Sequence, residues 1–442
     1  MSAALDSSAA ASFPQNERTS RWCLALACGL TIAWFLIYAS VRPDGLCDEP
    51  GHMGIIYHLH EGKSGYPDTM TMLPGYHFLV LGLSFGHPSL TTARLVTLAT
   101  ALLAIFAFAA AWRRFHGEPP GPAALLLALL PVLQPFTAMA YSDVPALAFV
   151  LCMWWAHLAG HRKSAALLFA VACLFRQTNF VWGVFILAWE AAQVLWPTTD
   201  EGAARPNGFA LWRAALSRVW IRGRWLLCAI LAAGVLAVIA GRLTIGDQHG
   251  NQLRPNIATL HFAGVLFALL GLPLWIAFAG QALPQLRQAW QHHPPRTSLA
   301  AALAAGASAL LAVTFANPHV WNRELFWPDC TFTLLRNWPL VWIDTHPWLR
   351  WLSGVNLVFL TLALIAGFAR QPHRVALWLS LLVGSLPAAV SFLVEPRYFI
   401  PPLVFLLFFL RLDRRTFRWL AAWFGFLCLV HAPFVATGLS LW

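Results

Sequence analysis

The sequence has little charge. Only 11% of its 442 residues are Asp, Glu, Lys or Arg, whereas 59% are hydrophobic and the mean hydropathy is +0.63. A soluble globular domain carries about 25% charged and about 45–50% apolar residues. This chain has too few charges to cover a water-facing surface and too much apolar mass for one core. A soluble globule and a disordered chain are therefore excluded, and the protein must be dissolved largely in lipid.

Motifs for nucleotide and metal chemistry are also missing. The chain contains no GxGxxG or Walker loop, no DxD or HExxH spacing and no CxxC pair. The histidines outside the apolar runs are too scattered to argue for a metal site. We therefore predict neither a metal nor a cofactor.

Long apolar runs dominate what is present. In lipid only helices and closed barrels satisfy their backbone hydrogen bonds, and continuous rather than alternating runs favour helices. We predict an all-α integral membrane protein, a polytopic bundle of about thirteen transmembrane helices. The predicted spans are 22–40, 91–112, 120–136, 143–160, 163–176, 179–196, 225–242, 258–280, 298–316, 351–369, 375–394, 397–412 and 419–441.

The chain divides into a polar N-terminal tail, 1–21, and a single polytopic membrane domain, 22–442. The first run lacks a convincing cleavage site, so we interpret it as a retained helix. The long external loops are predicted at 41–90, 243–257 and 317–350. Within the first of them, Tyr76–Phe85 is apolar but too short to span, which indicates a helix lying at the membrane interface.

The basic residues sort to one side of the predicted bundle. With the N-terminus inside, the inside segments hold 19 of the 29 basic residues, and the outside segments hold the other 10 with 11 of the 18 acidic ones. This matches the positive-inside rule, so the net charge of +11 sets topology and does not indicate a nucleic-acid partner. The inside loop 197–224 is basic and bears Trp, which predicts contact with an anionic leaflet. Any chemistry is expected at the outer face.

Two adjacent carboxylates, Asp48 and Glu49, directly follow the first span. Carboxylates at the membrane–water boundary are costly unless they are paired or used. Either one can act as a general base; the alternative is a solvated loop start.

Several arginines share the outer face with acidic residues. Arg94, Arg176, Arg323, Arg336 and Arg397 lie at helix ends or in the outer loops. Each alone can pair with a carboxylate, extend to the headgroups or bind a phosphate. A group of them at headgroup depth suits the phosphate of a polyprenyl lipid.

These segments together resemble the GT-C glycosyltransferases, and more specifically the dolichyl-phosphate-glucose alpha-1,2-glucosyltransferases. The matching stretches occur in the family's order and cover most of the chain, and the Arg-Gln-Thr-Asn and Arg-Tyr-Phe stretches are the most specific. They are Asp48-Glu49 with His52, Leu73-Pro74-Gly75, Tyr141-Ser142-Asp143, Phe175 to Asn179, Gly246-Asp247, Leu260-His261-Phe262, Asn322-Arg323 and Glu395 to Ile400.

The resemblance implies an inverting, metal-independent transferase that moves a hexose, glucose, from a polyprenyl-phosphate donor to a glycan or lipid-linked oligosaccharide acceptor. It makes Asp48 the leading base with Glu49 as its competitor, and Arg176, Arg323 and Arg397 the phosphate-binding residues. The other predicted substrate-binding residues are His52, Asp143, Gln177, Asn179, Asn322, Glu395 and Tyr398.

The chain departs from the family pattern at Glu324–Cys330, and it is short and rich in Arg rather than Lys. These features are typical of a bacterial protein, which implies an undecaprenyl carrier and an inner-membrane protein with its site facing the periplasm. In a eukaryote the carrier is dolichol and the site faces the lumen of the endoplasmic reticulum. Two alternatives stay open: a GT-C transferase for another sugar such as mannose or arabinose, and a polytopic lipid or sugar transporter. Against a transporter, the charges lie at helix ends and no inverted repeat is evident.

Overall fold

The structure is a computed structural model that describes residues 16–63, 72–196, 208–239, 256–319, 322–323, 337–391 and 393–438. Every regular element among these residues is a helix. The helices are α1 Glu17–Val41, α2 Glu49–His60, α3 Gly75–Leu83, α4 Leu90–His116, α5 Gly121–Ala128, η1 Pro135–Thr137, α6 Asp143–Leu158, α7 Arg162–Phe175, η2 Gln177–Asn179, α8 Phe180–Leu195, α9 Gly208–Ile239, α10 Ile257–Leu270, α11 Leu272–His292, α12 Pro294–Thr314, α13 Trp338–Thr345, α14 Pro347–Ala369, α15 Arg374–Ala389, η4 Pro396–Phe399, α16 Ile400–Phe409 and α17 Arg414–Thr437.

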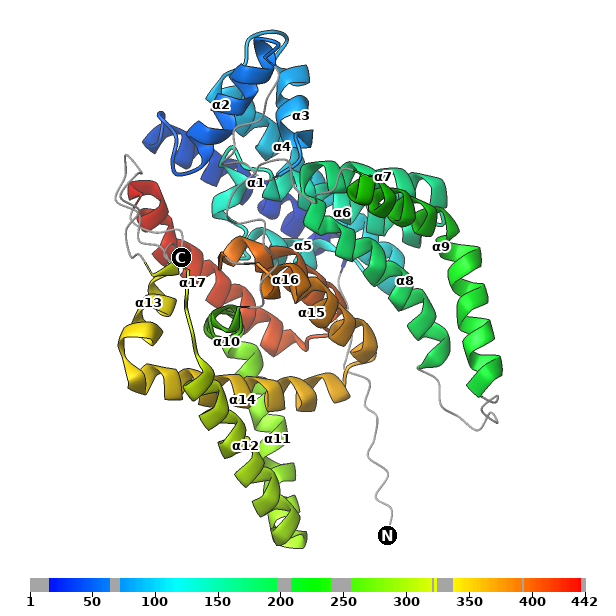
Figure 1. Cartoon of the computed structure of the whole chain (residues 1–442), viewed down its shortest axis with the longest axis vertical. Helices are drawn as coiled ribbons and strands as arrows, with labels where there is room; N and C mark the ends of the chain where they lie inside the picture. The colour runs from blue at the N-terminus through cyan, green and yellow to red at the C-terminus, as the bar shows by residue number, and fades with distance from the viewer. Residues whose placement is uncertain are drawn as a thin grey trace.

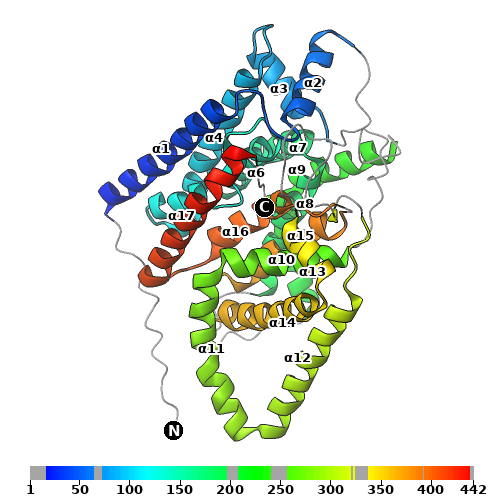
Figure 2. The ribbon, with the colours of Figure 1, turned by 90° about the vertical axis from the view of Figure 1, so that its left-hand side faces the viewer.

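The helices form an elongated bundle whose two ends differ. The short helices α2 and α3 lie at one end, and the tip of the hairpin formed by α11 and α12 lies at the other (Figure 1; Figure 2). The predicted interfacial helix in the first long loop corresponds to α3, nine residues from Gly75 to Leu83. The predicted tail is shorter than expected, because α1 begins at Glu17, where the Asn16 side chain accepts the Arg18 backbone N–H at 3.0 Å.

The protein is a polytopic helical membrane protein. Within the described ranges, seven helices are long and apolar enough to cross a bilayer, or eight if α10 and α11, which meet at 88°, make one broken span. The other five predicted spans fall on α5, α6, α7, α15 and α16, which have 8 to 16 residues each. The count of thirteen is therefore not confirmed.

Two predicted segments differ from the structure. The span 120–136 is not one helix: α5 ends at Ala128, Pro131 lacks the backbone N–H that would continue it, and Pro135 begins the single 3-10 turn η1. The basic segment 197–224 is not a loop throughout, because α9 is already helical from Gly208. Residues 243–255 of one predicted loop, and residues 320–321 and 324–336 of the other, including Arg336 and Glu324–Cys330, lie outside the described residues.

The core of the bundle is built around α16. Nine of its ten residues are buried, and it packs against α5 and α15. Phe405 stacks on Trp182 of α8 with ring centroids 4.3 Å apart. Because α16 follows η4 directly, the buried helix fixes the position of the charged residues in η4 and just before it.

Candidate active site

Glu49, at the start of α2, is the centre of a buried hydrogen-bond network. Its carboxylate accepts five hydrogen bonds, and its side chain is fully buried. Two come from the Arg94 guanidinium, at 2.8 Å each, and one from the Tyr38 hydroxyl at 2.9 Å. The backbone N–H groups of Leu46 and Ala140 donate the other two, at 2.8 and 2.7 Å. This network ties α1, α2, α4 and the segment before α6 together.

Asp48 points elsewhere. Its side chain is 28% exposed, and its Oδ2 lies 3.2 Å from Nη1 of Arg397. Its backbone N–H donates to the Tyr141 hydroxyl at 3.0 Å. The preceding Cys47 adopts a left-handed conformation with φ of 55°, which turns the chain sharply just before the two carboxylates. Asp48 and Glu49, although adjacent in sequence, therefore contact different sets of residues.

Arg397, in η4, is shared by three carboxylates. It pairs with Asp48 and with Glu395, and its Nη1 lies 3.9 Å from Oδ2 of Asp143. Its guanidinium also lies over the ring of Tyr141, 5.4 Å from the ring centroid. The Arg397 side chain is 10% exposed, so these ion pairs are largely shielded from water.

A second arginine joins the same cluster. Arg176, which follows α7, donates to Oδ1 of Asp143 at the start of α6 and lies 5.7 Å from the ring centroid of Tyr398. Gln177 and Asn179 form the 3-10 turn η2 that follows, and the buried Asn179 amide donates to the Ala172 carbonyl at 2.9 Å. These contacts close the end of α7 and hold Arg176 at the cluster.

The short helices at this end cover the cluster. A Cβ on Gly75 would lie 2.6 Å from the Leu174 carbonyl oxygen, so only glycine allows α3 to approach the end of α7 this closely. The stretch Leu73-Pro74-Gly75 thus explains how α3 reaches the turn that carries Arg176.

His52 is buried beside the cluster. Its Nδ1 lies 3.0 Å from Nε2 of His77 on α3, and its ring packs on Tyr141 with centroids 5.4 Å apart. Its Nε2 has no hydrogen-bond partner among the described residues. Burial, with the positive charges of Arg397 and Arg176, lowers the pKa of His52 to about 3. His52 is therefore neutral at physiological pH and can bind a hydroxyl but not act as a cation.

Asn322 and Arg323 differ in how they relate to the Arg397 cluster. The buried Asn322 side chain accepts the Val394 backbone N–H at 3.1 Å and so anchors the segment that leads into Glu395. Arg323 donates to the Asn317 carbonyl at 2.5 Å and lies 3.6 Å from Asp344. Its side chain is 56% exposed, and among the described residues neither of these contacts joins it to the Arg397 cluster.

The structure thus connects Asp48, His52, Asp143, Arg176, Glu395, Arg397 and Tyr398 through direct contacts. A model of the DIE2/ALG10 family matches residues 68–408, more than half of the chain. The chain belongs to the DIE2/ALG10 family. Its matched region contains Asp143, Arg176, Glu395 and Arg397, whereas Asp48, Glu49 and His52 precede it.

The chain is similar to a human protein, the Dol-P-Glc:Glc(2)Man(9)GlcNAc(2)-PP-Dol alpha-1,2-glucosyltransferase of Homo sapiens. The two are 24% identical over 327 residues, which cover 61% of this chain and 66% of the human protein, slightly less than two thirds of its length. No solved structure matches the chain.

Three residues that contact this candidate site are not among the predicted site residues. Tyr141 contacts Asp48, His52 and Arg397, and its place two residues before Asp143 was the available signal. For Arg94 the sequence leaves open pairing with a carboxylate, extension to the headgroups and phosphate binding, and the structure pairs it with Glu49. His77 gave no signal, because nothing in the sequence relates it to His52, 25 residues earlier.

Proposed function

We propose that the protein is an inverting glycosyltransferase that moves glucose from a polyprenyl-phosphate donor to a lipid-linked oligosaccharide or other glycan acceptor. The observation that carries the proposal is the shielded cluster of Asp48, Asp143 and Glu395 around Arg397, with Arg176 beside it, in a chain of the DIE2/ALG10 family. The name of the human relative supports the donor class, the linkage and the oligosaccharide acceptor.

The geometry suits a single displacement. Asp48 takes the proton of the acceptor hydroxyl, whose oxygen bonds to the anomeric carbon while the bond from that carbon to the phosphate oxygen breaks. The donor is a phosphodiester with one negative charge, and the leaving lipid phosphate carries two. One negative charge therefore moves from Asp48 to the phosphate, and Arg397, which pairs with Asp48 before reaction, is placed to follow it.

The other charged residues receive supporting roles in this proposal. Asp143 and Glu395 hold Arg176 and Arg397 in place. The Asp143 Oδ2, which has no hydrogen-bond partner among the described residues, can accept a sugar hydroxyl. Glu49 has no acceptor position left for a substrate proton, because five donors already occupy its carboxylate. Neutral His52 can offer its Nε2, which has no hydrogen-bond partner among the described residues, to an acceptor hydroxyl. The exposed Arg323 keeps its predicted phosphate-binding role in this proposal.

We place the site on the outer side of the membrane. The excess of basic residues in the opposite segments supports this orientation. The carrier is undecaprenol if the protein comes from a bacterial inner membrane, with the site facing the periplasm, and dolichol if it comes from the endoplasmic reticulum.

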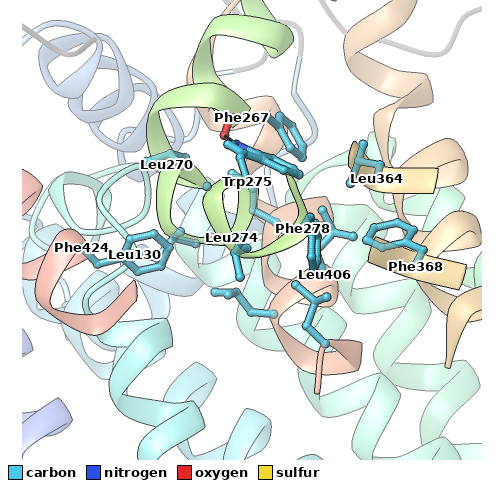
Figure 3. Close-up of a pocket in the computed structure, with 14 residues that line it drawn as sticks. Leu130, Phe267, Leu270, Leu274, Trp275, Phe278, Leu364, Phe368, Leu406 and Phe424 are labelled. Carbon is cyan, nitrogen blue, oxygen red and sulfur yellow. Dashed lines mark hydrogen bonds between the residues drawn. The ribbon is translucent and has the colours of Figure 1, made fainter. Parts of the chain in front are cut away.

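An apolar cavity gives the lipid chain of the donor a place within the bilayer. It is lined by Leu, Phe, Trp and Gly residues of α10, α11, α14, α16 and α17 and of the segments beside them, among them Phe267, Trp275, Phe368, Leu406 and Leu130, which follows α5 (Figure 3). The Trp275 indole N–H is satisfied by the Phe267 carbonyl at 2.7 Å. Phe267 and Phe399 have ring centroids 6.3 Å apart, so the cavity adjoins the 3-10 turn that carries Arg397.

Leu406→Phe should narrow this cavity and raise KM for a long-chain polyprenyl-phosphate glucose roughly fivefold, because each CH₂ that cannot be buried forfeits about 0.8 kcal/mol. The KM for a short-chain analogue with two isoprene units should stay unchanged. Leu382→Phe, at a side chain 63% exposed on α15, is the matched control. An equal rise in KM for both donors would refute a lipid-chain role for the cavity.

Tyr141→Phe should lower kcat about three- to tenfold with little change in KM, because a single hydrogen bond contributes about 1 kcal/mol. The variant keeps the ring under Arg397 but loses the oxygen that accepts the Asp48 backbone N–H. Steady-state kinetics measure the effect, with Tyr57→Phe on the exposed side of α2 as control. An unchanged kcat would show that Tyr141 does not position Asp48.

The proposed function is tested by a donor-specificity assay with the purified full chain. Polyprenyl-phosphate glucose, mannose and arabinose are supplied on undecaprenyl and dolichyl carriers, with a lipid-linked oligosaccharide as acceptor. Transfer of glucose with inversion to an alpha linkage is the expected result. Transfer of only mannose or arabinose would show that the donor sugar is not glucose. Movement of intact lipid-linked sugar across a vesicle membrane, without a new glycosidic bond, would favour the transporter.

A further inference from the structure

A group of basic side chains lies on α7 and α9, far from the Arg397 cluster. We call Arg162, Lys163, Arg218, Arg222 and Arg224 the α7–α9 basic cluster. Arg162 Nη1 donates to the Ile221 carbonyl at 2.6 Å, which brings the start of α7 against the middle of α9. Lys163 and Arg224 flank the Trp225 ring, with the Lys163 Nζ 5.3 Å and the Arg224 Cζ 5.8 Å from its centroid.

Positive charge in this cluster exceeds negative charge. The carboxylate that pairs with it among the described residues is Glu190 of α8, whose side chain is fully buried. Glu190 lies 2.6 Å from Nε of Arg218 and 3.3 Å from Nε of Arg222, and it also pairs with His157. The side chains of Arg218 and Arg222 remain one third exposed, so their outer nitrogens face the surroundings of the protein. Among the described residues, the five cations of the cluster and the carboxylate of Glu190 thus leave a formal excess of four positive charges.

The cluster lies at the end of the helices opposite Asp143 and Arg176. Helix α7 begins at Arg162 and ends next to Arg176, while α6 begins at Asp143 and ends near His157. Helices of this length separate their ends by roughly 20 Å, at 1.5 Å per residue. Arg397 and the α7–α9 basic cluster are therefore on opposite sides of the bundle.

Tryptophans indicate the depth of the cluster in the membrane. Trp212, Trp220 and Trp225 on α9 are all exposed, and Trp side chains gather at the membrane–water boundary. Helix α9 has 32 residues, or roughly 48 Å, whereas the hydrocarbon layer is roughly 30 Å thick. The basic first half of α9 must then extend through the headgroup layer.

We propose that the α7–α9 basic cluster is a binding site for anionic phospholipid headgroups in the leaflet opposite the Arg397 cluster. Guanidinium groups bind phosphate oxygens in pairs, and the exposed tryptophans pack beside the glycerol and upper acyl chains. A zwitterionic headgroup brings its own cation, which this excess of positive charge repels. The inference needs no transferase activity and holds for any function of the chain.

The experiment measures binding of dioleoyl-phosphatidylglycerol and dioleoyl-phosphatidylcholine to the detergent-purified full chain by native mass spectrometry. The triple variant Arg162→Gln, Lys163→Gln, Arg224→Gln leaves the pairs of Glu190 intact and should weaken phosphatidylglycerol binding roughly tenfold or more, with phosphatidylcholine unaffected. The matched control is Arg287→Gln, Arg296→Gln, Arg418→Gln, which removes the same charge from exposed arginines elsewhere.

Equal losses in the two triple variants would overturn the site, because binding would then follow net charge alone, and so would an unchanged affinity in the first. The charge-preserving variant Arg162→Lys, Lys163→Arg, Arg224→Lys guards against misfolding. It should retain most of the affinity, and a loss as large as that of the glutamine variant would also contradict an electrostatic site.

Discussion

Asp48→Asn should lower kcat for glucose transfer by roughly 10²–10⁴-fold, the usual contribution of a general base. Asparagine has the same shape and keeps the backbone N–H that donates to Tyr141, so the fold and the position of Arg397 should survive. The carboxylate itself is accessible to an acceptor hydroxyl, because its side chain is 28% exposed and its one ion pair among the described residues is with Arg397.

The measurement is kcat at saturating donor and acceptor, with thermal unfolding in detergent as a check on the fold. Asp44→Asn, an exposed carboxylate four residues earlier in the same loop, is the matched control and should retain its rate. If Asp48→Asn keeps a rate within threefold of the parent protein, Asp48 is not the base.

The sequence predicted two adjacent carboxylates as competitors, and the structure separates them. Their difference depends on residues far away in the chain: Arg94 and Ala140 contact Glu49, while Arg397 contacts Asp48. Side chains next to each other in sequence at the start of a helix point in different directions, but only the packing of α4 and η4 decides which partner each one meets. No local pattern carries that information.

Composition and apolar runs were sufficient for the fold class. Each predicted span overlaps a helix, because about 20 apolar residues in lipid have few other solutions. Boundaries were less certain where proline intervenes, as at Pro131, and where a basic stretch continues a helix, as in α9. Buried short helices such as α16 do not carry the length signal of a membrane span.

The sequence predicts charged residues at helix ends, but it does not predict which of them contact one another. The sequence groups Arg323 with Arg397 because both fall in predicted outer loops, whereas in the structure Arg323 pairs with Asp344. Arg176 and Asp143 are both predicted site residues, but the sequence does not predict that they form an ion pair. The pair requires the turn η2 to hold the end of α7 against the start of α6. Contacts between distant segments decide these cases.

Glu49→Gln should destabilise the protein by about 3–5 kcal/mol, the cost of breaking a buried ion pair by removing one partner. Arg94 is 3% exposed and would be left as a buried cation facing a neutral amide, although Tyr38 and the Arg42 carbonyl still contact it. A glutamine also presents an NH₂ group to donors that need an acceptor, so the bonds from Leu46 and Ala140 cannot all be kept.

Thermal unfolding of the detergent-purified variant measures this loss, and transfer should fall only in proportion to the folded fraction. The double variant Glu49→Gln, Arg94→Gln should be less destabilised than the sum of the two single variants, because the second change removes the unpaired charge that the first creates. A Glu49→Gln protein that unfolds like its parent yet transfers no glucose would reverse the assignment. Glu49 would then be the base, and Asp48 would be the residue that orients Arg397.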